Sequence, residues 1–226
     1  MGSTRLPGKV VKEINGLPLI VHIYRRLLAC KELDQVAVAI GYEGAGNPDA
    51  QPILDVCKRY ALYSDATIGV EDLIRRYKYA TQKYNADAFV RITADCLFHD
   101  PEYVNAMVRD YRNTYPRYRG LSNWKGGRVI SEGLDAEIYS TELLMELDRN
   151  PKCPREDFAV YAAENNLVGQ WPPIENQRFP IGHDLHLSID TQQDFDRAEK
   201  MLKILGNSEW RYEKTLEAYR KVMAEE

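Results

Sequence analysis

The stretch Ala88-Phe89-Val90-Arg91-Ile92-Thr93-Ala94-Asp95-Cys96, followed by Asp100-Pro101, decides the fold of this chain. Residues 88–92 are mostly apolar and β-prone, so they predict a buried strand that ends just before Asp95. Proline is tolerated in the first turn of a helix, so Pro101 predicts a helix that begins there. A strand that leads through a short turn into a helix is the repeating unit of a mostly parallel sheet covered by helices.

The same alternation of strand-like and helical segments runs along the rest of the chain. We expect strands over 36–40, 88–92, 134–139 and 185–189. We expect helices over 17–30, 53–60, 70–84, from Pro101 onward, 141–147, 156–165, 194–205 and 210–223. Between these elements we expect a loop over 43–52, a long connection over 116–133 and an irregular excursion over 169–184. The sequence therefore predicts one α/β domain over residues 1–226. Its core would be a Rossmann-like, mostly parallel sheet flanked by helices, with a small inserted lobe.

Length and composition exclude several classes of protein. The 226 residues are 44% hydrophobic and 28% charged, which are ordinary globular values and exclude a disordered, collagen-like or disulfide-framework chain. The formal net charge is −4, so the surface has no general attraction for nucleic acid or membranes. The 15 tyrosines could stack on bases, but without a basic surface or an RNA-binding motif they predict no nucleic-acid partner.

The cysteines and the apolar runs indicate a cytoplasmic protein. The four cysteines are scattered and form no C-x-x-C pair, so we expect reduced, buried thiols. No apolar run approaches the length of a membrane span. The opening residues also lack the apolar stretch of a secretory signal.

The opening segment, Gly2-Ser3-Thr4-Arg5-Leu6-Pro7-Gly8-Lys9, has the composition of a phosphate-binding loop. Small residues leave backbone N–H groups accessible, and Arg5 and Lys9 add positive charge, so the segment suits the phosphates of a nucleotide. It is not a Walker A motif, because the glycine spacing differs and Val10 stands where that motif has Ser or Thr. A solvated N-terminus with a proline turn would explain these residues equally well.

Two carboxylates follow predicted strands. Asp95 comes after strand 88–92 and Asp190 after strand 185–189, and open α/β sheets bind ligands at such strand ends. Mg²⁺ prefers one or two carboxylates together with phosphate oxygens and water, so Asp95 and Asp190 are candidate Mg²⁺ ligands. The alternative for each is a helix cap or a turn residue.

Five short motifs occur in order along the chain: Met-Gly-Ser-Thr-Arg-Leu-Pro-Gly-Lys (1–9), Gly-Val-Glu-Asp-Leu-Ile-Arg-Arg-Tyr (69–77), Arg-Ile-Thr-Ala-Asp-Cys (91–96) with Asp100-Pro101, Ser122-Asn123 with Gly-Leu-Asp-Ala-Glu (133–137), and Ser-Ile-Asp-Thr (188–191) with Asp194. In this order they resemble the cytidylyltransferases that make CMP-activated acidic sugars, the CMP-Kdo and CMP-sialate synthetases. The resemblance is strongest to the spore-coat-polysaccharide branch. It covers nearly the whole chain.

The resemblance implies a sheet of the nucleotide-diphospho-sugar-transferase type and a Mg²⁺-dependent reaction. CTP and a small anionic acceptor would give CMP-acceptor and pyrophosphate, for surface polysaccharide synthesis. Residues 1–115 would form the nucleotide-binding half and residues 116–226 the acceptor side. The resemblance assigns catalysis to Arg5 and Lys9; nucleotide binding to Gly2, Ser3, Thr4, Arg5, Lys9, Glu71, Asp72 and Thr93; acceptor binding to Asn123, Asp135 and Glu137; and Mg²⁺ to Asp95 and Asp190.

The chain departs from the family at two positions beside Asp95, where the backbone would approach the ligand less closely, and at one position that bears on the acceptor. Ala94 stands where the family usually has Gly, Leu97 where it often has Pro, and Asp157 where the branch often carries His. The acceptor therefore stays open between an acidic sugar and a phosphorylated polyol or phosphonate. A nucleotide-binding relative without turnover is a further alternative, and the presence together of Arg5 and Lys9 with the two aspartates argues against it.

The resemblance also implies a homodimer and a further strand. Relatives are commonly dimers, and residues 169–184 are the expected dimer arm. In the family, a short apolar strand precedes the phosphate loop, whereas here Met1 stands directly before Gly2. We therefore expect this first strand to be absent from residues 1–226 and the sheet to have a gap.

Overall fold

The computed structural model describes residues 5–42, 50–125, 130–171, 185–206 and 210–225. The strand expected over 88–92 is found at those bounds as β5 (Ala88–Ile92), and helix α4 (Pro101–Thr114) begins at the expected proline. Asp100 caps α4, because its carboxylate accepts a hydrogen bond of 2.8 Å from the backbone N–H of Glu102. The expected strand over 88–92 and the expected helix start at Pro101 are both confirmed.

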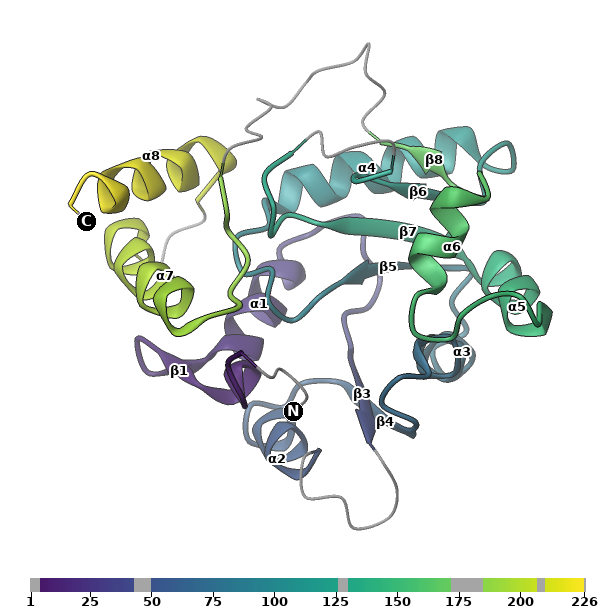
Figure 1. Cartoon of the computed structure of the whole chain (residues 1–226), viewed down its shortest axis with the longest axis horizontal. Coiled ribbons are helices and arrows are strands. Elements are labelled where there is room, and N and C mark those ends of the chain that lie inside the picture. The colour runs from purple at the N-terminus through teal and green to yellow at the C-terminus, as the bar shows by residue number, and fades with distance from the viewer. Residues whose placement is uncertain (1–4, 43–49, 126–129, 172–184, 207–209, 226) are drawn as a thin grey trace.

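The other elements alternate along the chain (Figure 1). The strands are β1 (Glu13–Ile14), β2 (Leu17–Pro18), β3 (Val38–Tyr42), β4 (Ser64–Ile68), β6 (Gly120–Ser122), β7 (Ala136–Ser140) and β8 (Gly169–Gln170). The helices are the short 3₁₀ helix η1 (Lys9–Val11) and α1 (Leu19–Leu28), α2 (Gln51–Arg59), α3 (Leu73–Lys83), α5 (Thr141–Arg149), α6 (Phe158–Glu164), α7 (Gln192–Leu205) and α8 (Tyr212–Met223).

The described strands form small sheets of mixed direction. Strand β5 is the edge of a four-stranded sheet with the order β5-β7-β6-β8, in which β7 runs antiparallel to both β5 and β6. Strands β3 and β4 form a separate parallel pair, and β1 and β2 form a hairpin. The α/β class is therefore confirmed, but the expected single, mostly parallel sheet is not what these strands form.

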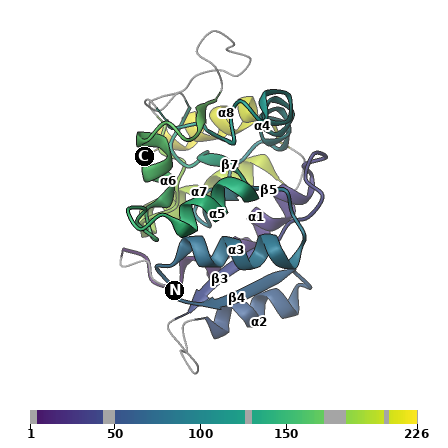
Figure 2. The same ribbon diagram turned by 90° about the vertical axis from the view of Figure 1, so that its right-hand side faces the viewer.

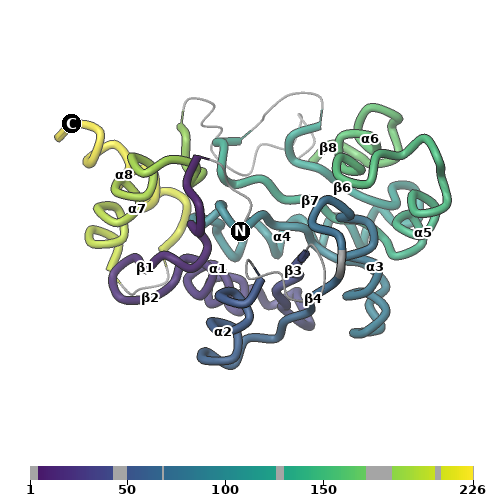
Figure 3. Tube along the Cα trace, turned by 60° about the horizontal axis from the view of Figure 1, so that its bottom comes forward, coloured from purple at the N-terminus to yellow at the C-terminus, as the bar shows by residue number. Residues whose placement is uncertain are grey.

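Side chains of β7 alternate between two hydrophobic cores, as the two-residue period of a strand requires. Ala136 and Ile138 pack into the core that includes residues of α1, α4, α7 and α8, whereas Tyr139 packs into the core with α3, α5 and α6. Helices thus cover both faces of the four-stranded sheet (Figure 2). A third, smaller core joins β3 and β4 to α2. In Figure 3, α7 and α8 lie with the β1–β2 hairpin at one end of the molecule and α5 and α6 at the other.

Residues 185–189 do not form the expected strand. Among the described residues, their backbone pairing consists of an isolated bridge between His186 and Glu132 and of single hydrogen bonds, one of which runs from Ile189 to Asp95. The described segments with which they pair, around Glu132 and Asp95, are loops and offer no strand edge for a regular ladder. Gly133 makes the close approach possible: its φ is +91°, and a Cβ atom there would overlap the backbone of Leu187 and Ser188.

Candidate functional site

The side chain of Lys9 lies at the centre of the site. Its Nζ donates hydrogen bonds to Asp95 Oδ2 at 3.0 Å, Asp190 Oδ1 at 3.1 Å and the carbonyl oxygen of Ile189 at 2.7 Å. An ammonium group has three N–H donors, so all three are used. Lys9 is buried, and its three hydrogen bonds connect chain segments that lie far apart in sequence.

The fold brings the two aspartates together through the segments that follow β5 and precede α7. Asp95 lies in the turn after β5, where Cys96 N–H donates to the carbonyl of Thr93. Ile189 N–H donates to the carbonyl oxygen of Asp95 at 3.1 Å, which joins the two segments directly. Neither aspartate caps a helix: Asp100 caps α4 and Thr191 caps α7, the latter as expected.

Asp190 is held by several partners besides Lys9. Its Oδ2 accepts a hydrogen bond of 3.1 Å from the hydroxyl of Ser188, and its backbone N–H donates to Asp194 Oδ2 at 3.2 Å. Arg5 Nη2 lies 3.2 Å from Asp190 Oδ1, and the Arg5 side chain is 66% exposed. The site therefore has one buried and one solvent-facing cation beside the same carboxylate.

The pKa of Asp95 is lowered in this environment. Burial raises the pKa of the carboxyl group, but the hydrogen bond from Thr93 and the charge and hydrogen bond of Lys9 outweigh that effect. Asp95 is thus ionised at neutral pH. Thr93, an expected nucleotide-binding residue, is found in direct contact with the site.

The other expected nucleotide-binding residues are in different places. Gly2, Ser3 and Thr4 lie outside the described residues. Glu71 is exposed just before α3. Asp72 caps α3 by accepting from the backbone of Arg75, and it also forms an ion pair of 2.8 Å with Arg155. Binding of a nucleotide by Glu71 and Asp72 stays a prediction.

The expected acceptor residues have structural partners. Asn123 is fully buried and its amide bonds to Tyr103, to the carbonyl of Leu134 and to the backbone N–H of Ala136. Glu137 is buried in an ion pair of 2.7 Å with Arg91 and also accepts from the indole of Trp124. Asp135 is half-buried, and its charge contributes to raising the pKa of Cys96, the residue next to Asp95.

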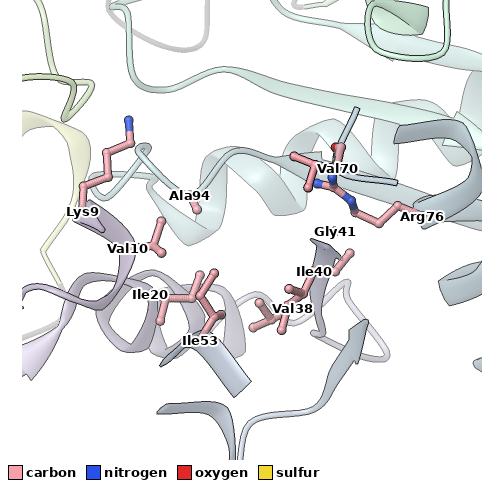
Figure 4. A pocket seen from close by; sticks show the side chains of 11 residues that line it. Lys9, Val10, Ile20, Val38, Ile40, Gly41, Ile53, Val70, Arg76 and Ala94 are labelled. Carbon is pink, nitrogen blue, oxygen red and sulfur yellow. Dashed lines mark hydrogen bonds between the residues drawn. The ribbon is translucent and has the colours of Figure 1, made fainter. Parts of the chain in front are cut away.

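A cavity of about 210 Å³ opens between the site and the β3–β4 sheet (Figure 4). Lys9 and Arg76 stand at its two ends, and Val10, Ile20, Val38 and Ile53 are among the apolar residues that line it. Sequence reasoning gave no role to Arg76 or to Ser188, although both lie within the quoted motifs. In the sequence, both are recognisable only as polar residues inside a matched motif. The fold shows that Arg76 lines the cavity and that Ser188 donates a hydrogen bond to Asp190.

The donor set fits Mg²⁺ bound together with phosphate. Asp95 and Asp190 offer two carboxylates on one site, which is the usual protein share of a Mg²⁺ shell that phosphate oxygens and water complete. Among the described residues there is no group of three or more His, Cys, Asp or Glu side chains that could hold a metal without such help.

The cysteines offer no alternative site chemistry. All four cysteines are free and buried, as expected. Burial and the charge of Asp95 raise the pKa of the Cys96 thiol well above its usual value, so it is no nucleophile at neutral pH. No described helix is both long enough and apolar enough to cross a membrane.

Comparisons with known proteins identify the family of the chain. The family model described as Cytidylyltransferase matches residues 1–223. The 3-deoxy-manno-octulosonate cytidylyltransferase of Acidobacterium capsulatum is 28% identical to this chain, over 89% of this chain and 93% of the relative. The spore coat polysaccharide biosynthesis protein SpsF of Bacillus subtilis is 21% identical to this chain, over 91% of this chain and 84% of the relative.

Solved structures share the fold. A cytidylyltransferase from Leptospira borgpetersenii superposes with a TM-score of 0.86 at 26% identity, over 99% of this chain and 92% of that one. A CMP:2-keto-3-deoxy-manno-octonic acid synthetase solved with CTP gives a TM-score of 0.66 at 15% identity, over 89% of this chain and 94% of that one.

Proposed function

Because the chain belongs to the cytidylyltransferase family, we propose that it transfers CMP from CTP to an acidic sugar and releases pyrophosphate. The observation that carries the proposal is the contact of Lys9 with both Asp95 and Asp190. It joins, on one buried site, the cation suited to a triphosphate and the two carboxylates suited to its metal. Relatives named for 3-deoxy-manno-octulosonate support an eight-carbon acidic sugar as the acceptor.

The reaction is a displacement at the α-phosphorus of CTP. An acceptor hydroxyl oxygen forms a bond to that phosphorus, the bond to the α,β-bridging oxygen breaks, and pyrophosphate leaves with the bond's electron pair while the hydroxyl proton passes to solvent. Negative charge grows on the phosphoryl oxygens and on the leaving group, so fixed cations lower the barrier. Lys9 would supply that charge from a buried position and Arg5 from the solvent side.

Mg²⁺, when bound, would neutralise the phosphates and orient the leaving group, with Asp95 and Asp190 as its protein ligands. Ser188 and Asp194 keep Asp190 in place through contacts that do not involve the nucleotide. On the acceptor side we propose Asp135, because it is half-buried and follows the buried Leu134, whereas Asn123 and Glu137 are buried.

The test is release of pyrophosphate from CTP with Mg²⁺ or with EDTA. The acceptor panel contains 3-deoxy-manno-octulosonate, a sialic acid, a phosphorylated polyol and a phosphonate, with a reaction lacking acceptor as the blank. We expect acceptor-dependent release that EDTA and Asp95→Asn abolish and that Lys12→Met, which removes a nearby lysine outside the site, leaves intact. No release with any acceptor, together with no CTP-induced rise in melting temperature, would refute the proposal.

We also propose that β3 and β5 belong to one sheet and lie on either side of a further strand. Within the described residues, β3 pairs only with β4 and β5 only with β7, and the β3–β4 pair lies on the β5 side of the larger sheet (Figure 1). The cavity between them is lined by Val38 and Ile40 of β3 and by Ala94 just after β5. All of β5 is half-buried, whereas all of β7 is buried. These features fit an apolar parallel strand in the gap.

A designed strand tests this directly. A short Val/Ile-rich segment is added ahead of residue 1, and its matched control carries Asp and Gly at the same positions. We expect the apolar extension to slow amide exchange in β3 and β5 by about tenfold or more, since paired N–H groups exchange only on opening. Unchanged exchange with both extensions would contradict the proposal. The pyrophosphate assay is run on both the 226-residue chain and the extended chain.

A further inference from the structure

The ammonium group of Lys9 occupies the place between the two carboxylates where a cation would be expected. Its three oxygen neighbours, Asp95 Oδ2, Asp190 Oδ1 and the carbonyl of Ile189, lie at 2.7–3.1 Å. Carboxylate and carbonyl oxygens are the donors that hard cations bind. The lysine therefore satisfies an oxygen cage that would otherwise attract a metal ion.

The two cations that contact Asp95 and Asp190 already balance the charge of this carboxylate pair. Asp95 and Asp190 carry two negative charges, and Lys9 and Arg5 carry two positive charges against them. A divalent cation arriving alone would meet no surplus of negative charge. It would also have to displace an ammonium whose side chain is only 11% exposed, leaving that charge buried without acceptors.

A triphosphate removes both obstacles. Phosphate oxygens offer Lys9 new acceptors of higher charge, and they bring negative charge of their own. Once the lysine turns to them, and the exposed Arg5 with it, Asp95 Oδ2 and Asp190 Oδ1 can bind a metal that the same phosphates also bind. The carboxylates need not move, because Ser188 holds Asp190 and the Ile189–Asp95 backbone hydrogen bond joins the two segments.

We propose that Lys9 acts as an internal counter-ion that keeps free divalent cations off the Asp95–Asp190 pair until a nucleoside triphosphate draws it away. Metal then enters the site with the nucleotide and not before it. The identity of the triphosphate as CTP rests on the proposed function, whereas the exclusion of free metal rests only on the geometry of Lys9.

The experiment measures Mn²⁺ binding by the loss of the free-ion electron paramagnetic resonance signal. We compare the wild type with Lys9→Met, whose unbranched side chain is one atom shorter and carries no charge. Lys12→Met is the matched control, because Lys12 bonds to Gln192 and not to the carboxylates. Lys9→Met with Asp95→Asn tests whether any gained ion sits at the expected carboxylate.

Without nucleotide, we expect Lys9→Met to bind Mn²⁺ about tenfold or more tightly than the wild type, because a unit charge a few ångströms from the ion has been removed. Lys12→Met should match the wild type, and the added Asp95→Asn should abolish the gain. Thermal unfolding with and without Mn²⁺ shows that each variant folds. If Lys9→Met does not fold, Lys9→Gln carries the same comparison, since its amide retains donors for the Ile189 carbonyl.

Two outcomes separate this inference from the proposed function. Wild type that binds free Mn²⁺ as tightly as Lys9→Met overturns the counter-ion role, even if CTP is turned over. A gain in Lys9→Met without any CTP-dependent increase in wild-type Mn²⁺ binding supports the exclusion of free metal and contradicts CTP as the releasing ligand.

Discussion

Replacing Glu137 by Gln should lower the stability of the protein and leave its catalytic activity unchanged. Glu137 Oε2 lies 2.7 Å from Arg91 Nη1, and the two side chains are 2% and 17% exposed. Burial lowers the pKa of Arg91, but the attraction of Glu137 outweighs this and raises it above the usual value. The arginine therefore stays charged, and the variant leaves it buried without a counter-ion.

The size of the effect follows from that burial. Removing one partner of a buried ion pair costs about 3–5 kcal/mol, and the lower figure applies because the glutamine oxygen can still accept from Arg91 or Trp124. For a domain of this length, about 3 kcal/mol corresponds to a fall of roughly 6–12 °C in melting temperature.

The assay is thermal unfolding with Glu146→Gln as the matched control. Glu146 also pairs with an arginine, Arg119, but its side chain is 50% exposed, so its loss should cost less than about 1 kcal/mol. The KM for the acceptor should be unchanged in folded Glu137→Gln. A melting temperature near the wild-type value combined with a raised acceptor KM would refute the reasoning and place Glu137 at the acceptor.

Three further predictions concern other parts of the fold. Asp95 has a lowered pKa in the folded state, so its contribution to stability is present at neutral pH and is lost as the pH falls below about 4. Between pH 7 and pH 3, the melting temperature of Asp95→Asn should therefore fall less than that of the wild type. Asp100 caps α4 and accepts a hydrogen bond from the backbone N–H of Tyr212 at 3.0 Å. In urea unfolding, Asp100→Ala should lower the free energy of unfolding by about 2–3 kcal/mol and Asp100→Asn by clearly less, and equal losses would contradict this. The Cys96 thiol should not react with a disulfide reagent in the native protein at pH 8 and should react after unfolding, whereas rapid native reaction would show that it is accessible.

The sequence predicted elements well where local signals agreed. Residues 88–92 combine β-prone side chains with a following polar turn and Pro101, so both β5 and the start of α4 were predictable. Strand β4 was missed, because Ser64, Asp65 and Thr67 interrupt its apolar pattern and its pairing with β3 is a long-range contact. Residues 185–189 look like a strand but lie beside loops, which no local pattern reveals.

The site residues were predictable as types but not as contacts. Lys9 was expected to face phosphates and the two aspartates to face a metal, and their direct contact with one another spans 86 and 181 residues of sequence. The burial of Glu137 against Arg91 was equally hidden, since alternation along a strand does not say which face is covered. Dimerisation and the expected arm over 169–184 stay predictions, with residues 172–184 outside the described part of the chain.

The most direct test of the central claim is a ³¹P nuclear magnetic resonance spectrum of the protein with CTP, Mg²⁺ and 3-deoxy-manno-octulosonate. The proposed reaction predicts a new phosphodiester resonance and pyrophosphate in equal amounts, both dependent on the acceptor and on Asp190. Intact CTP with every acceptor, for the 226-residue chain and the strand-extended chain alike, would contradict it. So would hydrolysis of CTP at the same rate with and without acceptor.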